Sequence, residues 1–310
     1  MDKRLLFFVF VSFATTVVVS AGELSSKWKL NGPSNSRIIL EADEFVPAGI
    51  NRAGVHIKLD TGWWTYWRAP GTSGIPPYFD WSGSKNVAGL PTLKWPIPIR
   101  AVAYGETLNL YRNEIVFPVA FKAANPALPV VLHLKLTYGI CKNMCVPATV
   151  EHEVVLAPPK PRRQPRVSQA NVRLISQFAE RQPSTDPLST GFEIREVWET
   201  EVRNLTQLGL RIQGQQMERR SLVLIEGPSV FKALELESKP LADSDESILM
   251  VSLGKSKEIR RLTGRRIRIT IIDGKRALEQ IWVVGTQSST TTGTGLTPIS
   301  SSDRTDRPQP

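Results

Sequence analysis

Two cysteines, Cys141 and Cys145, are the only ones in the 310-residue sequence, and the pattern around them constrains the fold more than any other feature. Residues 132–138 alternate between apolar and polar side chains, as a half-buried strand does. Residues 150–156 repeat this period of two after the cysteines. The pattern therefore predicts a β-hairpin that carries both cysteines at its exposed tip.

The spacing of the two cysteines limits the local conformation. A disulfide needs Cα atoms roughly 4.4–6.8 Å apart, whereas four extended residues span about 13 Å. Residues 142–144 must therefore turn or coil if Cys141 and Cys145 are to form a disulfide. Because so short a ring removes little entropy from the unfolded chain, the bond would stabilise the fold less than a long-range bridge does. From the spacing alone, a redox-active pair and a stable bridge both remain open.

The first 21 residues have the three parts of a secretory signal. Lys3 and Arg4 provide a basic start, residues 5–19 are apolar, and residues 19–21 fit a cleavage site before Gly22. An uncleaved membrane anchor is the alternative, although the apolar run is short for a full span. Export would place both cysteines in an oxidising compartment, where an unprotected pair tends to form a disulfide.

The positive charge of the chain is concentrated in one segment. The formal net charge is +10, and residues 160–181 hold six basic side chains against one acidic side chain, Glu180. Such clustering indicates a linker rather than a nucleic-acid-binding face, so we expect no nucleic-acid partner. The three histidines, His56, His133 and His152, belong to no Ser/His/Asp pattern, and the chain has no phosphate-binding loop. The sequence therefore offers no sign of a hydrolase.

Short strands separated by turn-forming residues predict an all-β protein. We expect a signal peptide over residues 1–21 and a first domain over residues 22–157. Its candidate strands cover residues 36–42, 53–59, 115–121, 130–138 and 149–156. This spacing favours an antiparallel sandwich of the immunoglobulin-like type.

An aromatic segment interrupts these strands at residues 61–77. Trp63, Trp64, Tyr66 and Trp67 are too closely spaced for a strand to direct all of them into the core. The Pro-Gly and Gly-Ile-Pro-Pro turns that follow predict a rigid, non-helical loop. The loop could pack over one end of the sandwich, or its aromatic side chains could wall a pocket around the cysteines.

The chain changes character after the first domain. Residues 158–188 are expected to form a proline- and arginine-rich linker, semi-rigid at its start, with a short helix over residues 168–181 that turns Val172, Ile175 and Ala179 to one face. Residues 189–285 predict a second β-sandwich without cysteine or histidine. Its candidate strands cover residues 192–198, 205–213, 222–225, 231–236, 248–253, 267–272 and 280–284. Residues 286–310 are rich in Ser, Thr and Gly and are expected to be disordered.

Several short motifs, in order over about 120 residues, resemble the N-terminal periplasmic domain of the thiol-disulfide interchange protein DsbD. The similarity is closest to the branch of the copper-sensitivity suppressor protein ScsB. The motifs are Gly62, Thr65-Tyr66-Trp67-Arg68, Pro70-Gly71, Ser73-Gly74-Ile75-Pro76-Pro77, Asp80-Trp81, Trp95-Pro96 and Cys141-x3-Cys145 with Val146-Pro147. Residues 168–285 weakly resemble the second half of the periplasmic region in the same branch.

The resemblance implies a fold and an activity. The fold would be two immunoglobulin-like antiparallel sandwiches, joined by the linker and helix. Cys141 and Cys145 would be the catalytic pair, taking electrons from a membrane electron-conduit protein and passing them to oxidised periplasmic thiol proteins, with Cys145 meeting the substrate first. Trp63, Tyr66, Trp67 and Tyr104 are expected to line the pocket. No cofactor is implied, and the chain would be a component of a protein-disulfide reductase.

The sequence departs from the ScsB branch at two points. It reads Tyr104-Gly105-Glu106 where that branch often has Tyr-Gly-Tyr, so the residues that cap the cysteines are not assigned from the resemblance. The membrane-spanning conduit and the thioredoxin-like domain of the full-length proteins have no counterpart in these residues. We therefore expect the reductant to be a separate protein.

Two other functions remain open. Two thiolates with Met144 are soft ligands that suit Cu(I), and His133 lies nearby in sequence, so copper is a candidate ligand. For redox exchange, Lys142 beside Cys141 would modestly favour a thiolate. The remaining alternative is a β-module with an inert bridge, which should have a reduction potential below about −300 mV.

Overall fold

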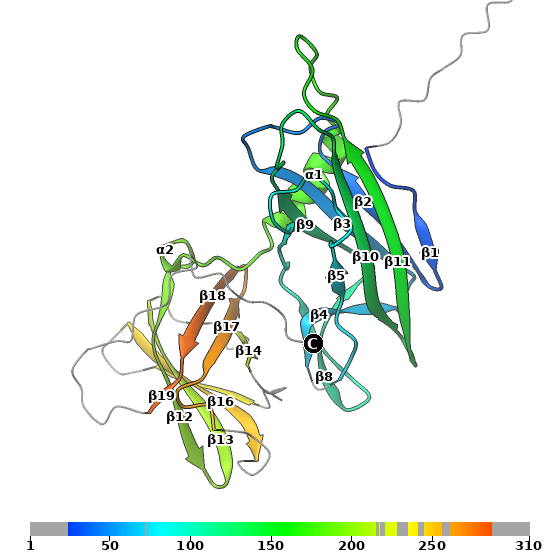
Figure 1. Cartoon of the computed structure of the whole chain (residues 1–310). Helices are drawn as coiled ribbons and strands as arrows, with labels where there is room; N and C mark the ends of the chain where they lie inside the picture. Colours follow the sequence, from blue (N-terminus) through cyan, green and yellow to red (C-terminus); the bar gives the residue numbers. More distant parts are fainter. Residues whose placement is uncertain are drawn as a thin grey trace, which may run out of the picture.

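The computed structural model describes residues 24–286, apart from residues 72, 215–216, 218–220, 228–234, 241–244 and 256–260. Two β domains lie side by side in it (Figure 1). The expected signal peptide, and the expected disordered tail beyond residue 286, lie outside the described residues. Among the helices that are described, none has the length and apolar character needed to span a membrane.

The first domain is a sandwich of two antiparallel sheets. One sheet has the strand order β1-β2-β3-β9-β6, and the other has the order β11-β10-β4-β8-β7 with β5 paired to β10. The strands are β1 Lys29–Asn31, β2 Ser34–Leu40, β3 Asn51–Leu59, β4 Trp64–Gly71, β5 Tyr78–Asp80, β6 Thr92–Leu93, β7 Ile99–Ala103, β8 Glu106–Arg112, β9 Glu114–Phe121, β10 Val130–Cys141 and β11 Cys145–Leu156.

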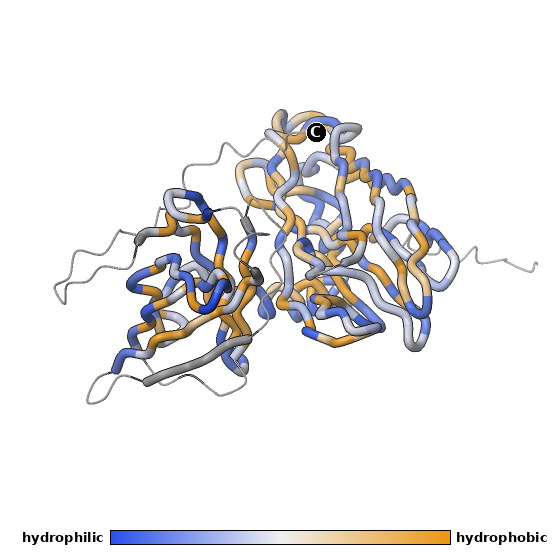
Figure 2. Tube along the Cα trace, turned by 90° about the horizontal axis from the view of Figure 1, so that it is seen from below, coloured by the Kyte–Doolittle hydropathy of each residue, from blue (hydrophilic) through white to orange (hydrophobic). Residues whose placement is uncertain are grey.

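The alternation of side chains predicted for β10 is confirmed. Leu132, Leu134, Leu136 and Tyr138 are fully buried and belong to one hydrophobic core that also contains Phe117 of the facing sheet. Apolar and polar residues alternate along strands of both domains in Figure 2. Since successive side chains of a strand point to opposite faces, this pattern turns one face of each sheet toward the core.

The aromatic segment contains a central strand, so the prediction of a loop over residues 61–77 is wrong for Trp64–Gly71. β4 lies between β10 and β8, and Gly62, at a positive φ of 84°, forms the turn before it. Trp67 points into the main core, whereas Trp64 and Tyr66 belong to a smaller cluster. The aromatic side chains are thus divided between the two faces of one sheet. The close spacing of the tryptophans in the sequence does not show this division.

The proline-rich segment after β11 is attached to the first domain. Ala157 forms a bridge with Glu44, and Val167 forms one with Ala42. Arg163 makes ion pairs with Asp43 and Glu44, at 2.7 and 3.1 Å. The segment therefore turns back onto the first domain, which differs from the linker that its composition predicts.

The predicted helix is present as α1, Gln169–Ala179, and it packs on the first domain. Ser168 caps it by accepting a hydrogen bond from the backbone N–H of Asn171. Ile175 and Phe178 are buried in the main core. Gly54 permits this contact, because a Cβ at that position would lie 3.1 Å from Ile175 and 2.7 Å from Val116.

The second domain is also a sandwich of two sheets. After the short helix α2, Pro187–Thr190, the strand orders are β15-β16-β13-β12-β19 and β14-β17-β18. The strands are β12 Phe192–Val202, β13 Leu205–Gly214, β14 Leu222–Glu226, β15 Glu235–Pro240, β16 Glu246–Lys255, β17 Arg266–Asp273, β18 Arg276–Val283 and β19 Gly285–Thr286. The strand expected at residues 231–236 falls largely outside the described residues. The other strands occur where the sequence predicts them.

The two domains share apolar contacts. Leu224 of β14 is buried within the core cluster of the first domain, and Leu222 and Ile272 pack against the same cluster. The connection between the domains is also paired: Ser184 forms a parallel bridge with Leu278 of β18. The second domain thus meets the first through a sheet face.

A buried polar network ties β11 to β2. The imidazole of His152 lies between two hydroxyl groups, with Nε2 2.9 Å from Ser36 Oγ and Nδ1 3.3 Å from Ser26 Oγ. The burial of His152, and secondarily the charge of Lys29, lower its pKa to about 4. Close by, Tyr138 Oη lies 2.7 Å from Ser34 Oγ. His152 is therefore neutral in the folded protein at neutral pH.

We predict that the domain loses stability as the pH falls from 6.5 to 4. In this window the unfolded chain, with an ordinary histidine pKa of 6.5, binds a proton that His152 in the folded protein does not. The stabilisation is complete above pH 6.5, and up to about 3 kcal/mol of unfolding free energy is lost by pH 4. Denaturant unfolding at a series of pH values measures it.

His152→Gln is the control, since it should remove this part of the pH dependence even if it lowers stability overall. His56 will retain a smaller dependence of the same sign, because burial lowers its pKa although Glu114 opposes the shift. An NMR titration that placed the pKa of His152 near 6.5 would contradict the prediction.

Candidate redox site

The cysteines occupy the end of a long, regular hairpin. β10 and β11 pair without a register shift from Val130↔Leu156 to Cys141↔Cys145. The three residues between the cysteines turn, with Lys142 N donating to Met144 O at 3.1 Å. Cys141 and Cys145 are joined by a disulfide with their Cα atoms 4.2 Å apart. The turn required by the spacing is therefore present.

The two cysteines differ in their exposure to solvent. Cys141 is 1% exposed and packs in the cluster of Trp64, Tyr66, Leu108 and Leu110, whereas Cys145 is exposed. The difference follows from the fold, because Cys141 pairs with Trp64 on the neighbouring strand β4, while β11 is an edge strand of its sheet. A molecule approaching from solvent would reach Cys145 first.

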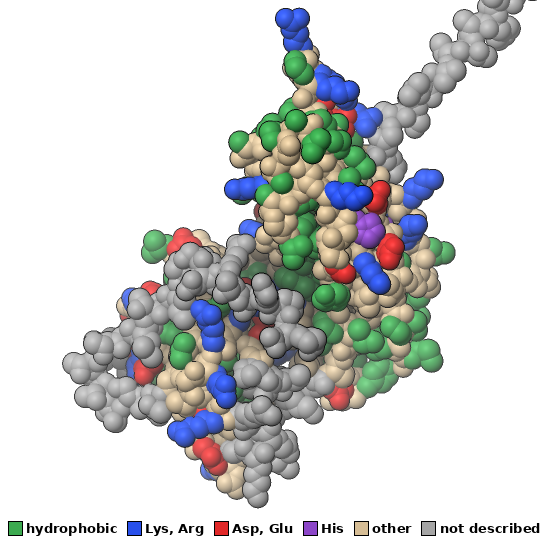
Figure 3. Space-filling view, viewed as in Figure 1, with side chains coloured by type: hydrophobic (Ala, Val, Ile, Leu, Met, Phe, Trp, Pro, Cys, Tyr) green, Lys and Arg blue, Asp and Glu red, His purple; other side chains and the backbone are tan. Residues whose placement is uncertain are grey.

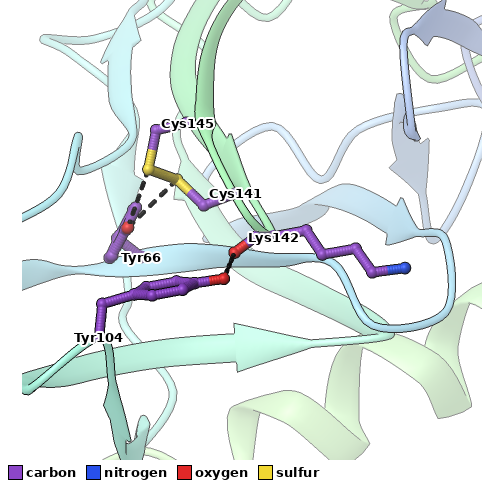
Figure 4. Close-up of a disulfide and its surroundings, with 5 residues drawn as sticks. All are labelled: Tyr66, Tyr104, Cys141, Lys142 and Cys145. Atoms are coloured by element: carbon purple, nitrogen blue, oxygen red, sulfur yellow. Dashed lines mark hydrogen bonds between the residues drawn. A yellow bond between two sulfur atoms is a disulfide. The ribbon is translucent and has the colours of Figure 1, made fainter.

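The hydroxyl of Tyr66 contacts both sulfurs. Tyr66 Oη donates to Cys141 Sγ at 3.1 Å, and it lies 3.3 Å from Cys145 Sγ (Figure 4). The side chain is 2% exposed. Gly74 covers its ring so closely that a Cβ there would lie 2.5 Å from Tyr66 Cε1. Tyr66 is thus a fixed hydrogen-bond donor directed at the disulfide.

Tyr104 holds the turn that joins the cysteines. It lies at a positive φ of 54° with Gly105 at 74°, and together they form the two-residue turn between β7 and β8. Tyr104 Oη is 2.8 Å from Lys142 O and 3.1 Å from Asn143 Oδ1. Its side chain is nevertheless 72% exposed. The tip of one hairpin therefore meets the tip of the other.

Lys142 does not face the sulfurs, contrary to the thiolate-stabilising role considered for it. Figure 4 shows its side chain extending away from the disulfide. Its Cε lies 3.2 Å from where a Cβ on Gly62 would stand. Within the described site, the hydroxyl of Tyr66 takes the place of a nearby cation as the group that can stabilise a sulfur anion.

The structure gathers part of the expected pocket. Tyr66 and Tyr104 lie at the cysteines, but Trp67 is fully buried in the main core on the other face of β4, and Trp63 packs against that core. Trp64, which the predicted pocket omits, is in the cluster around Cys141. The signal for Trp64 was its spacing of two from Tyr66, which places both on one face once the segment is read as a strand.

The described residues give no support to a copper site. His133 pairs with Glu153 eight positions before Cys141, which is roughly 26 Å along β10. It therefore cannot join Met144 and the cysteines as a ligand in this fold. In the part of the chain that is described, no three His, Cys, Asp or Glu side chains are grouped to hold a metal.

The geometry suits thiol–disulfide exchange. Such a site needs one accessible sulfur, a second sulfur close enough to resolve a mixed disulfide, and a group that stabilises the departing thiolate. Cys145 supplies the first and Cys141 the second. Tyr66 supplies the third, because a hydrogen bond to the charged form lowers the pKa of a thiol.

Residues 36–157 match the family model described as thiol:disulfide interchange protein DsbD, N-terminal. The crystal structure of the N-terminal periplasmic domain of ScsB from Proteus mirabilis is similar to this chain, with a TM-score of 0.60 and 19% sequence identity, covering 86% of this chain and 100% of that chain. None of the curated proteins compared with the sequence matches it. The likeness to the ScsB domain shows the fold, and the family match contains both cysteines, Tyr66 and Tyr104. The first domain of this protein therefore belongs to the DsbD N-terminal family and is a thiol–disulfide exchange module.

Proposed function

We propose that this protein relays reducing equivalents, from a membrane electron-conduit protein to oxidised thiol proteins of the periplasm, through Cys141 and Cys145. The observation that carries the proposal is the unequal exposure of two disulfide-bonded cysteines whose sulfurs both lie within hydrogen-bond distance of the Tyr66 hydroxyl. The proposal includes export by residues 1–21 and cleavage before Gly22. It assigns the donor and acceptor proteins by class only.

Charging the domain begins at the exposed sulfur. A thiolate of the reduced donor attacks Cys145 Sγ, the bond between Cys145 and Cys141 breaks, and Cys141 leaves as a thiolate beside Tyr66 Oη. The second thiolate of the donor then attacks the donor's own sulfur in the mixed disulfide. Cys145 leaves as a thiolate and takes up a proton, as does Cys141. The donor is oxidised to a disulfide and the domain now carries two thiols.

Discharge reverses this order. The Cys145 thiolate attacks a disulfide of the acceptor and releases one acceptor thiolate, which is protonated. Cys141 then attacks Cys145 Sγ, which restores the domain disulfide and frees the second acceptor thiol. The short separation between the cysteines keeps the resolving sulfur next to the mixed disulfide throughout.

Exposed apolar side chains surround the cysteine turn. Tyr104, Met144, Val146 and Val102 are large, exposed hydrophobic residues of the β10–β11 and β7–β8 tips. Figure 3 shows hydrophobic side chains gathered on the lower part of the first domain. An apolar surface of this kind, next to the accessible sulfur, supports transient docking of partner proteins.

The first prediction concerns single-cysteine variants. Cys141→Ala should leave Cys145 able to form mixed disulfides with oxidised glutathione, because Cys145 is exposed. Cys145→Ala should react at least about tenfold more slowly, because the remaining Cys141 is buried. Mass spectrometry of the trapped adducts measures both rates, and unfolding curves check that the variants fold. Equal rates in two folded variants would count against the assignment of Cys145 as the attacked sulfur.

The second prediction concerns stoichiometry. The sequence contains two cysteines, so the reduced chain carries one pair of electrons. The pre-reduced protein should reduce one equivalent of a test disulfide and then stop, and turnover should resume when a reduced conduit-type protein is supplied. Quenched-flow thiol counting measures the yield. Sustained reduction without a donor would show that the protein is not a relay.

The third prediction separates Tyr66 from its neighbour in the core. Tyr66→Phe should raise the apparent pKa of the reacting cysteine and slow alkylation of the reduced pair at pH 7 roughly three- to tenfold, since one hydrogen bond to sulfur is lost. Trp67→Phe should lower the free energy of unfolding by about 1–3 kcal/mol and leave the alkylation rate unchanged. If Trp67→Phe alters the reactivity as much as Tyr66→Phe does, the two faces of β4 are not functionally distinct.

A further inference from the structure

Arg68 joins the redox domain to the second domain. Its Nε donates to both carboxylate oxygens of Glu226 at 3.0 and 2.9 Å, and its Nη2 donates to Glu226 Oε1 at 2.8 Å. Arg68 Nη2 also donates to Glu279 Oε2. The Arg68 side chain is 15% exposed, and its guanidinium lies 4.4 Å from the ring centroid of Trp67. This is a largely buried, bidentate ion pair between β4 and the β14–β17–β18 sheet.

The charges of this cluster balance. Arg268 of β17 lies 3.6 Å from Glu226 Oε2 and 3.6 Å from Glu279 Oε1, so two arginines face two glutamates. Removing one member of such a set leaves its partners poorly compensated, which is more costly than the loss of a surface pair. The ion-pair cluster therefore holds the second domain against β4.

β4 needs support at this position because its pairing with β8 is interrupted. Trp64, Thr65 and Tyr66 pair with β8, and the next pair in the register is Gly71↔Leu108. Residues 67–70 thus lie outside the ladder. Within the described residues, this stretch is held on the first domain's side by the buried ring of Trp67 and by Asn109 Nδ2, which donates to Ala69 O at 2.9 Å. From the other side it is held by the second domain through Arg68.

Tyr66 is the last ladder residue before this unpaired stretch, and it lies two positions from Arg68. Two positions of extended backbone span roughly 7 Å, and the register shift between Tyr66 and Gly71 lets the two side chains point into different environments. Tyr66 directs its hydroxyl at the two sulfurs, and Arg68 directs its guanidinium at Glu226 and Glu279. A displacement of Arg68 would therefore move the backbone that sets the position of Tyr66 Oη.

We propose that the second domain, acting through Arg68, positions Tyr66 at the disulfide and thereby sets the reactivity and reduction potential of Cys141 and Cys145. Arg68 is a positioning residue, since it touches neither sulfur. The inference rests on the proposed function for its chemical consequence. It gives the second domain, which has no cysteine or histidine of its own, a defined effect on the redox site.

The test compares Arg68→Met with a matched control in the full chain. Arg211→Met is the control, because Arg211 of β13 also pairs with two glutamates, Glu196 and Glu246, at 3.1 and 3.3 Å, within the second domain. In Arg68→Met we expect faster hydrogen exchange over Trp64–Gly71, a higher apparent pKa of the reacting cysteine, and an equilibrium constant for reduction by dithiothreitol about threefold lower. That factor corresponds to about 14 mV. Arg211→Met should change none of the three.

A double-mutant cycle decides whether Arg68 acts through Tyr66. If it does, Arg68→Met should have no further effect on the cysteine pKa or the reduction constant once Tyr66→Phe is present. Arg68→Lys should restore part of the effect, because it keeps the charge without the bidentate geometry. Glu279→Gln keeps the Glu226 contact and should give a smaller shift of the same sign, so it serves if Arg68→Met fails to fold.

The outcomes separate this inference from the proposed function. Suppose that the wild-type disulfide is reversible, and that folded Arg68→Met has the same pH–rate profile and reduction potential as the wild type. This result overturns the inference but does not contradict the proposed relay function. Additive effects of the two substitutions also overturn it, because Arg68 would then act independently of Tyr66. A wild-type pair that cannot be reduced in the folded protein overturns the relay. In that case, only the comparison of hydrogen exchange over Trp64–Gly71 between the wild type and Arg68→Met tests whether the second domain holds β4 in place.

Discussion

The register of the β10–β11 hairpin is the constraint on which the redox site depends. Twelve consecutive pairs run from Val130↔Leu156 to Cys141↔Cys145 without a bulge. A slip of one residue would turn the core face of β10 to solvent and would also separate the two cysteines, so burial of Leu132, Leu134 and Leu136 fixes the sulfur pairing. The hydrophobic core of the domain and the geometry of its disulfide are therefore set by the same alternation of side chains.

The strand beside this hairpin divides the domain into two environments. On one face of β4, Trp67 completes the main core; on the other, Trp64 and Tyr66 form a small cluster around Cys141. That cluster buries one sulfur while the edge position of β11 leaves the other exposed. The chemical inequality of two cysteines only four positions apart thus originates in the different neighbours of β10 and β11, and not in the residues between the cysteines.

Local sequence patterns correctly predicted those structural features that depend on residues close together in the chain. The alternation in β10 and β11 was sufficient for the hairpin, and the motifs from Gly62 to Pro147 were sufficient for the family. Trp67 lies in the main core and not in the expected pocket, because Pro-Gly turn signals suggested a loop where pairing of Trp64, Thr65 and Tyr66 with β8 starts a strand. The contacts of the proline-rich segment with Asp43 and Glu44 were not predicted, because the partners are more than 100 positions away in sequence. Arg68 and Glu226 are 158 positions apart in sequence, and no local sequence pattern predicts that they form an ion pair.

The shortness of the disulfide ring explains how one fold can serve both redox states. By the chain-entropy estimate, a loop of about five residues contributes only about 2 kcal/mol to stability. The hairpin itself is held by its backbone ladder and by the fully buried side chains of β10, none of which involves the sulfurs. Breaking the Cys141–Cys145 bond therefore removes a small part of the stability and leaves Tyr66 and the two sulfur positions in place. A long-range bridge would couple reduction to partial unfolding, whereas this one confines the change to the tip of a hairpin that the rest of the domain holds.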